Sequence, residues 1–319
     1  MSKNPKDFVK IFQCPDCGGD LVVADAGFCC EKCERLFPIY KGIAIFISNA
    51  EWRNFFNKQF LDYYFSDEWR AIFERALAQD DYLEAIKLLD KYSDDKKWQE
   101  SWANRLSEPW LENEEQQAAV WAGNKRTIEL GNVSEAKMIL DWPTGPGECM
   151  RGMLDKIAKD AVIVSSEINL LTIFRLKKYL EAMGLADNIL FVNNDVTKMP
   201  FKNNVFDLVT AFGLTVEVPD PDKALRETFR VMHAGGVMVG NGDFYHEGSE
   251  SIKIADEMNL GQIATEERFL KTARALGFKN IELETAWEGL DTDDMPDEER
   301  CPLPARGDWS AYTVIRAKK

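Results

Sequence analysis

Residues 138–150 read MILDWPTGPGECM, and this stretch decides the fold of the chain. It begins as an apolar strand that ends in Asp141, and it continues into a tight turn that holds Gly145 and Gly147. Glycines allow the backbone of such a turn to approach a ligand closely. A glycine-containing turn between a strand and a helix is typical of loops that bind nucleotide-type cofactors.

Pro143 occupies a position of this turn where a glycine is usual. Proline fixes its φ at about −65° and has no N–H group, so it cannot replace a glycine that needs a positive φ. We therefore expect the turn to bend at Thr144 and Gly145, with Pro143 stiffening it. A dinucleotide loop would carry a third glycine three residues after Gly147, where this chain has Met150, so the spacing favours another cofactor.

Residues 126–319 alternate strand and helix patterns, which is typical of an α/β fold with a doubly wound parallel sheet. The patterns predict strands at 136–141, 161–168, 188–195, 205–213, 237–243, 280–287 and 309–318, and helices at 147–159, 170–184, 222–236 and 266–278. Ligands of such sheets bind at the carboxyl ends of the strands. We therefore expect Asp141, Glu167, Asp195 and Phe212 to lie along one edge.

Several motifs in this segment, in the right order, resemble those of class I S-adenosylmethionine-dependent methyltransferases. MILDWPTGPG stands for the first motif, VIVSSEIN for the second, NNDVTKMPFKNNVFDLVTAFG for the third and fourth, and PDPDKALRETFRVMHAGGVMV for the stretch that follows. The resemblance covers about a third of the chain and is closest to the group that acts on quinones, sterols and other small molecules. It implies a Rossmann-like seven-stranded domain that transfers a methyl group to a small molecule by in-line displacement.

The resemblance also implies roles for residues along the expected edge. The methionine end of the cofactor would be held by Asp141, Gly145 and Gly147, with Pro143 and Thr144 in the same loop. Glu167 would bind the ribose, beside Ile168, and the adenine would be flanked by Asp195 and Val196. The floor near the sulfonium would be formed by Phe212 and Gly213. A general base is needed only if the methyl acceptor is protonated at the working pH. Glu217 and His246 are our candidates for contact with the acceptor, although each could be an ordinary loop residue.

Five of the seven cysteines lie within the first 33 residues. Cys14 and Cys17 form one C-x-x-C pair, and Cys30 and Cys33 form a second, a spacing typical of a closed, tetrahedral Cys₄ zinc site. Cys29 adjoins Cys30, but the two-residue gap to Cys33 makes Cys30 the better ligand. The segment resembles the short zinc ribbon at the front of many methyltransferases, of which a free-standing relative activates methyltransferase partners. We expect the zinc to be structural, because a closed shell has no position for a substrate.

The chain is thus predicted to consist of a zinc ribbon (residues 1–49), a helical, aromatic-rich segment (50–125) and the Rossmann-like domain (126–319). The helical segment either packs its aromatic stripe on neighbouring helices or forms part of a lid. No secretory signal begins the sequence, and no apolar run reaches the roughly 20 residues that cross a bilayer, so we expect a cytoplasmic protein without a membrane span.

A net charge of −15 counts against a broad nucleic-acid-binding surface, because such surfaces bind phosphate through Lys and Arg. An RNA methyltransferase therefore remains only an alternative to a small-molecule enzyme, as does a catalytically silent methyltransferase-like partner protein. Arsenite methylation would require several thiols around the pocket, and only Cys149 and Cys301 lie outside the ribbon. The methyl acceptor and the oligomeric state are not specified by the sequence.

Overall fold

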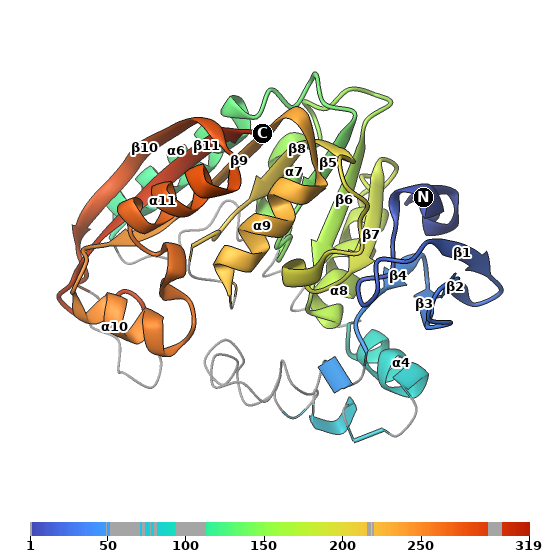
Figure 1. Cartoon of the computed structure of the whole chain (residues 1–319). Helices are drawn as coiled ribbons and strands as arrows, with labels where there is room; N and C mark the ends of the chain where they lie inside the picture. The colour runs from blue at the N-terminus through green and yellow to red at the C-terminus, as the bar shows by residue number, and fades with distance from the viewer. Residues whose placement is uncertain are drawn as a thin grey trace.

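One twisted sheet runs through the structure (Figure 1). The computed structural model describes residues 2–48, 50–51, 71, 74–76, 78–79, 82–93, 113–215, 218, 220–292 and 302–319. The sheet has eleven strands in the order β1-β2-β3-β4-β7-β6-β5-β8-β9-β11-β10. This arrangement confirms the predicted α/β class, although the sheet has more than the seven expected strands.

The seven strands of the Rossmann-like part are β5 (Met138–Asp141), β6 (Val162–Glu167), β7 (Ile189–Asn193), β8 (Phe206–Ala211), β9 (Met232–Tyr245), β10 (Lys279–Leu290) and β11 (Trp309–Lys318). Neighbours pair in parallel from β7 to β9, whereas β11 is antiparallel to both β9 and β10. Every residue of β6 and β7 is buried. Such uninterrupted burial is typical of parallel strands that are covered by helices on both faces.

Helices cover both faces of this sheet. Residues of α6 (Glu114–Leu130), α7 (Glu148–Met153) and α8 (Leu170–Ala182) share one hydrophobic core with one face, and residues of α9 (Pro221–Val231) and α11 (Glu266–Leu276) share another core with the opposite face. Helix α4 (Tyr82–Tyr92) packs against α8, and α10 (Glu250–Glu257) lies beyond the end of β9 (Figure 1). The described residues also form three 3₁₀ helices: η1 (Pro5–Ile11), η2 (Val196–Lys198) and η3 (Gly261–Ile263).

The cysteine-rich segment joins the same sheet rather than standing apart. Its strands are β1 (Leu21–Ala24), β2 (Gly27–Cys30), β3 (Leu36–Tyr40) and β4 (Ile43–Ile45). Strand β4 pairs in parallel with β7, so that Ala44 lies opposite Val192, and the N–H of Phe46 donates to the carbonyl of Asn193 at 2.8 Å. Phe46 and Phe12 pack together with ring centroids 5.2 Å apart. The ribbon therefore completes the edge of the Rossmann-like sheet.

Three differences from the predicted elements have local causes. Strand β9 begins at Met232, inside the predicted helix 222–236, because Met232 is already extended and pairs with Phe206 of β8. Helix α7 ends at Met153 rather than at 159. Helix α10 was not predicted, and its N-cap Ser249 accepts from the N–H of Ile252.

The helices α4 and α6 agree with the helical pattern expected between 50 and 125, but most of that segment lies outside the described residues. The division into three domains stays a prediction. Among the described helices, none is both long enough and apolar enough to cross a membrane.

Candidate cofactor site and metal centre

The loop after β5 bends where its glycines allow it. Gly145 has a φ of +48° and Gly147 a φ of +80°. Apart from its two chain neighbours, no atom of the described residues lies within 4 Å of the position where a Cβ on Gly145 would stand, whereas a Cβ on Gly147 would lie 2.9 Å from Cδ1 of Leu176. Gly145 therefore leaves open space beside the backbone, and Gly147 allows the loop to pack on α8.

The first half of this loop is fixed from within. The peptide bond between Trp142 and Pro143 is cis, and the Trp142 side chain is fully buried. Thr144 is buried, donates from Oγ1 to the carbonyl of Asp141 at 2.8 Å, and donates its N–H to the carbonyl of Ser166 at 2.9 Å. These bonds tie the loop to the end of β6.

Asp141 ends β5 and is only 1% exposed. Its Oδ1 accepts from Oγ1 of Thr210 at 2.6 Å, while its Oδ2 is buried and meets no nitrogen or oxygen donor at hydrogen-bond distance in the described part of the chain. The thiol of the buried Cys149, a weak donor, lies beside this carboxyl group. Burial raises the pKa of this carboxyl group to about 7. A buried polar atom without a partner is costly, so Oδ2 fits a hydrogen-bond donor, above all a cationic one, supplied by a ligand.

Glu167 ends β6 and is also buried. Its Oε2 accepts from the N–H of Gly145 and its Oε1 from the N–H of Asn169, both at 2.8 Å. Burial raises the pKa of Glu167, and these backbone bonds oppose the shift. The carboxylate thus joins the glycine loop to the start of α8, and it can contact a ligand only through its remaining lone pairs.

Asp195 lies just beyond β7 and is half-buried. Its Oδ1 accepts from both the N–H and Oγ1 of Thr197 at 2.8 Å, which caps η2. Val196 is buried and Ile168 is half-buried at the end of the neighbouring strand. These residues lie at the same edge of the sheet as Asp141 and Glu167, as expected.

Two asparagines at this edge were missed by the sequence reasoning. Asn193 donates from Nδ2 to the carbonyls of Glu167 and Ile168, both at 2.8 Å, and therefore ties β7 to the end of β6. Asn194 accepts from Oγ of Ser166 at 2.8 Å, and its Nδ2 is buried without a hydrogen-bond partner among the described residues. The signal that could have identified them is a pair of adjacent amides at the end of an apolar strand.

A second polar network supports the loop after β8, where Gly213 has a φ of +71° and Phe212 is half-buried. The N–H of Gly213 donates to Oδ1 of Asn241 at 3.1 Å. Oδ1 of Asn124, on α6, accepts from Nδ2 of Asn241 at 3.0 Å and from the hydroxyl of Tyr312 at 2.5 Å. Because these partners are distant in the sequence, no local pattern could have predicted the network.

The two candidates for contact with the methyl acceptor stay predictions. Glu217 lies outside the described residues. His246 is exposed and stacks on Trp309, with ring centroids 4.0 Å apart and an angle of 5° between the planes. His246 lies six residues after Gly240, the last β9 residue that pairs with β8. Six residues of extended chain span about 20 Å. His246 therefore lies just past the end of β9, well beyond the last pairing with β8.

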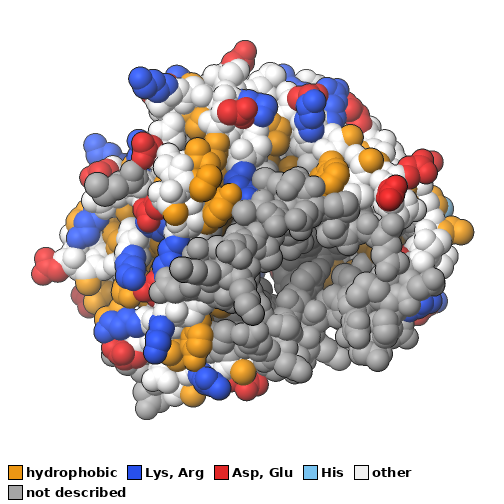
Figure 2. All heavy atoms as spheres, turned by 180° about the vertical axis from the view of Figure 1, so that it is seen from behind, with side chains coloured by type: hydrophobic (Ala, Val, Ile, Leu, Met, Phe, Trp, Pro, Cys, Tyr) orange, Lys and Arg blue, Asp and Glu red, His pale blue; other side chains and the backbone are white. Residues whose placement is uncertain are grey.

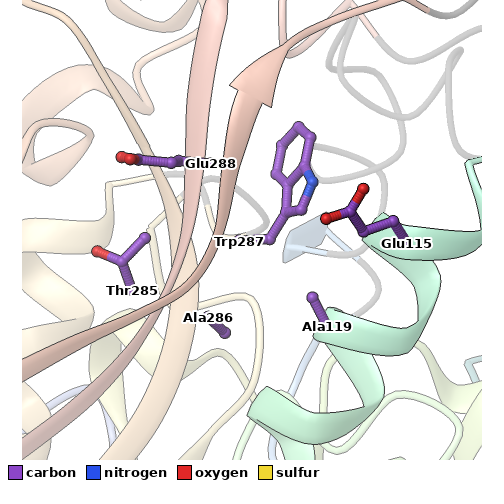
Figure 3. A pocket seen from close by; sticks show the side chains of 6 residues that line it. All are labelled: Glu115, Ala119, Thr285, Ala286, Trp287 and Glu288. Atoms are coloured by element: carbon purple, nitrogen blue, oxygen red, sulfur yellow. The ribbon is translucent and has the colours of Figure 1, made fainter.

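A hollow of about 430 Å³ lies at the start of α6 and beside β10 (Figure 3). Ala286 and Trp287 point from β10 toward α6, whereas Thr285 and Glu288 point to the other side of the strand. The remaining lining residues, Glu115 and Ala119, belong to α6. No predicted site residue lines this hollow, and it is separate from the loops after β5 and β6.

The four predicted metal ligands do come together. The Sγ atoms of Cys14, Cys17, Cys30 and Cys33 all lie within 4.8 Å of one another. Zinc–sulfur bonds of about 2.3 Å in a tetrahedron require sulfur atoms about 3.8 Å apart. The pairs Cys14–Cys33 at 3.7 Å and Cys17–Cys30 at 3.5 Å fit that geometry. Cys29 lies outside the group.

The strand order of the Rossmann-like part, β7-β6-β5-β8-β9-β11-β10 with an antiparallel β11, agrees with a class I methyltransferase domain. Residues 115–255 match the model of the ubiE/COQ5 methyltransferase family. This match confirms the recognition of a methyltransferase domain.

Two relatives carry the same name, ubiquinone/menaquinone biosynthesis C-methyltransferase UbiE. That of Edwardsiella ictaluri is 35% identical over 113 residues, which are 34% of this chain and 44% of the relative. That of Legionella pneumophila is 32% identical over 114 residues, which are 35% of this chain and 45% of the relative. The chain therefore spans less than half of the length of these relatives.

Among solved structures, similarity extends over more of the chain at lower identity. Phosphoethanolamine N-methyltransferase 2 of Haemonchus contortus is 16% identical with a TM-score of 0.49, over 62% of this chain and 52% of that one. A SAM-dependent O-methyltransferase of Thermotoga maritima is 18% identical with a TM-score of 0.42, over 62% of this chain and 64% of that one.

Proposed function

We propose that the chain is an S-adenosylmethionine-dependent methyltransferase that acts on a small molecule. The family match over residues 115–255 supports the activity. The observation that carries the proposal is the buried, unpartnered Oδ2 of Asp141 beside the open backbone of Gly145, at the carboxyl edge of a parallel sheet. The names of the relatives support an acceptor that belongs to quinone biosynthesis and is methylated on carbon.

S-adenosylmethionine, when bound, supplies a methyl group on a positively charged sulfur. Oδ2 of Asp141 would accept hydrogen bonds from the ammonium group of the cofactor, and the backbone at Gly145 would lie against it. The remaining lone pairs of Glu167 would serve the ribose, and Asp195 would serve the adenine. By fixing these groups, the chain would hold the methyl group in line with the acceptor, which contributes several kcal/mol through proximity.

We also propose that the Cys₄ group holds one zinc ion with a structural role. Four thiolates complete its coordination shell, so that no position remains for a substrate. A segment as small as the ribbon buries little apolar surface of its own, and metal binding would provide much of its folding free energy.

An RNA acceptor finds less support. On the face shown in Figure 2, Lys and Arg side chains are interspersed with Asp and Glu rather than gathered into one basic field. The net charge of −15 agrees with this distribution. Binding of RNA that weakens steeply with salt would revive that alternative.

Calorimetric titration with S-adenosylhomocysteine tests the proposal. We expect saturable binding, which Asp141→Asn weakens by at least about tenfold because the neutral amide cannot pair with the ammonium group. Asp160→Asn is the matched control, since Asp160 is exposed and pairs with Lys137 at the opposite end of β5. If S-adenosylhomocysteine gave no binding heat with the unmodified chain, the proposed enzymatic activity would be refuted. The alternative of a catalytically silent partner protein would then remain.

A further inference from the structure

Strand β9 continues well beyond the edge of the parallel sheet. The pairing of Ala211 with Gly240 is the last between β8 and β9, yet β9 runs on to Tyr245, supported along this extension by β11. Five residues of strand span about 16 Å. The extension therefore forms a wall that rises past the carboxyl edge, two strands from β5, whose loop belongs to the proposed cofactor site.

The two faces of this wall are defined by their contacts. Val239 belongs to the core on the α6 side of the sheet, and the side chain of Asn241 reaches Asn124 of α6. Phe244 instead packs on Phe269 of α11. Because side chains alternate along a strand, Asp243 projects on the same side as Asn241.

The backbone around Asp243 is held in place. Oγ1 of Thr215, in the segment after β8, donates to the carbonyl of Asp243 at 2.9 Å. A Cβ on Gly242 would lie 2.4 Å from Oγ1 of Thr215, so the two segments are in close contact. The N–H of Leu214 donates to the carbonyl of Asn241 at 2.9 Å. Asp243 thus lies where β9 meets the segment that carries Gly213.

The carboxylate of Asp243 is half-buried and makes no hydrogen bond or ion pair with the described residues. Burial raises its pKa to about 6. The β11 residue opposite it is Tyr312, a phenol that donates to Asn124 of α6. In the described segment after β8, the neighbour of Asp243 is Thr215, which is uncharged.

Two arginines of the neighbouring elements pair with other carboxylates. Arg126 of α6 pairs with Glu284 of β10 at 2.8 Å, and Arg316 of β11 pairs with Glu282 at 3.0 Å. Glu115 of α6 lines the hollow beside Trp287. Trp287 lies on β10, one strand beyond β11, and pairs with Tyr312 of β11. An ionised carboxylate with a pKa near neutrality, and with open hydrogen-bonding capacity, is well matched to proton transfer at pH 7.

We propose that Asp243 accepts the proton that the methyl acceptor loses, which makes the acceptor a neutral carbon or oxygen acid such as a hydroxylated aromatic ring. This inference rests on the proposed methyltransferase function. An electron pair of the acceptor forms the new bond to the methyl carbon, and the electron pair of the broken S–C bond stays on sulfur. The acceptor's proton moves to Oδ of Asp243 and then to solvent, so that charge and atoms balance.

The test uses the full chain with S-adenosylmethionine and 1,4-naphthalenediol, kept reduced, with the methylated product measured by mass spectrometry. We expect Asp243→Asn to lower kcat by about 10²–10⁴-fold, the usual contribution of a positioned base. Binding of S-adenosylhomocysteine should stay within about twofold of the unmodified chain. Asp160→Asn, which changes an exposed aspartate at the opposite end of the sheet, is the matched control and should retain its kcat.

The pH profile separates catalysis from a structural role. The kcat of the unmodified chain should fall below about pH 6, as Asp243 becomes protonated, and the residual activity of Asp243→Asn should lack this limb. An unchanged kcat in the variant, or loss of cofactor binding together with kcat, would overturn the inference. Cofactor binding without any methyl transfer to the diol would overturn the acceptor class, whereas absence of cofactor binding would refute the proposed function itself.

Discussion

Asp141 carries one paired and one unpaired carboxylate oxygen at the end of β5. Its pKa is raised by burial from 3.8 to about 7, so the folded state retains a proton that the unfolded state has lost. The stability that this residue contributes is therefore greatest below about pH 4 and declines as the pH rises to about 7, by at most about 4 kcal/mol.

Asp141→Asn should remove that decline. At pH 8 we expect the variant to be more stable to urea than the unmodified chain, because no charge is buried, and at pH 4 the two should differ little. The difference between the two unfolding free energies, followed across this range, checks the prediction. A difference that does not change with pH would contradict it.

The same residue predicts a pH dependence of cofactor binding. Asp141 must be ionised to pair with an ammonium group, and its pKa is about 7 in the free protein. Affinity for S-adenosylhomocysteine should therefore increase as the pH rises from 6 to 8. Titrations in buffers of different ionisation enthalpy should show proton release at pH 6, which Asp141→Asn should lack.

Gly145 and Gly147 provide a matched pair of alanine substitutions. Both have a positive φ, which costs an alanine roughly 1–2 kcal/mol. In Gly147→Ala the new methyl group also meets Leu176, so its melting temperature should fall further. In Gly145→Ala the methyl group enters open space beside the loop, and cofactor affinity should fall although no protein atom is displaced. Equal affinity losses in both variants would contradict these separate roles.

At the scale of elements, the Asn124–Asn241–Tyr312 network connects α6, β9 and β11 to the turn at Gly213. Asn241→Ala would leave the N–H of Gly213 without its partner, which costs about 1–3 kcal/mol for a buried group. We expect weaker cofactor binding, by about tenfold.

Tyr312→Phe should act in the same direction but less strongly, since a typical hydrogen bond contributes about 0.5–1.5 kcal/mol. Titration with S-adenosylhomocysteine measures both effects, with Tyr179→Phe on α8 as the control. If the two network variants bound as the control does, the network would have no role in the site.

Local patterns predicted some elements correctly. The strand predicted at 309–318 matches β11, and the bend at Gly145 lies where proline chemistry required it. The helix expected at 222–236 was too long because its end is set by pairing between Met232 and β8, a contact outside the local sequence. The extension of β9 past its last pairing with β8 places His246 beyond the end of the strand, which no local pattern indicated.

For the whole molecule, the ribbon and the methyltransferase domain share one sheet through β4 and β7. The sequence predicted the Cys₄ group from spacing alone, but it contained no signal for this pairing, because the register joins residues that are far apart in the chain. Metal binding and cofactor binding should therefore be coupled. Removal of the metal with a chelator should lower both the melting temperature and the affinity for S-adenosylhomocysteine.

Cys29 and Cys30 give the matched test. Cys30→Ser should reduce the metal content, measured by atomic emission, and should lower the melting temperature. Cys29→Ser should leave about one zinc ion per chain, because Cys29 lies outside the sulfur group. Loss of metal in Cys29→Ser alone would reverse the ligand assignment.

The parallel pairing of Ala44 with Val192 also sets an order of events on the ribosome. The cysteine-rich segment is translated first, and nearly half of the chain must follow before its partner strand emerges. A metal ion acquired early would keep the nascent segment folded during this wait, because its own core is small. Zinc shortage during translation should therefore reduce the yield of native chain more than zinc removal from the finished protein does.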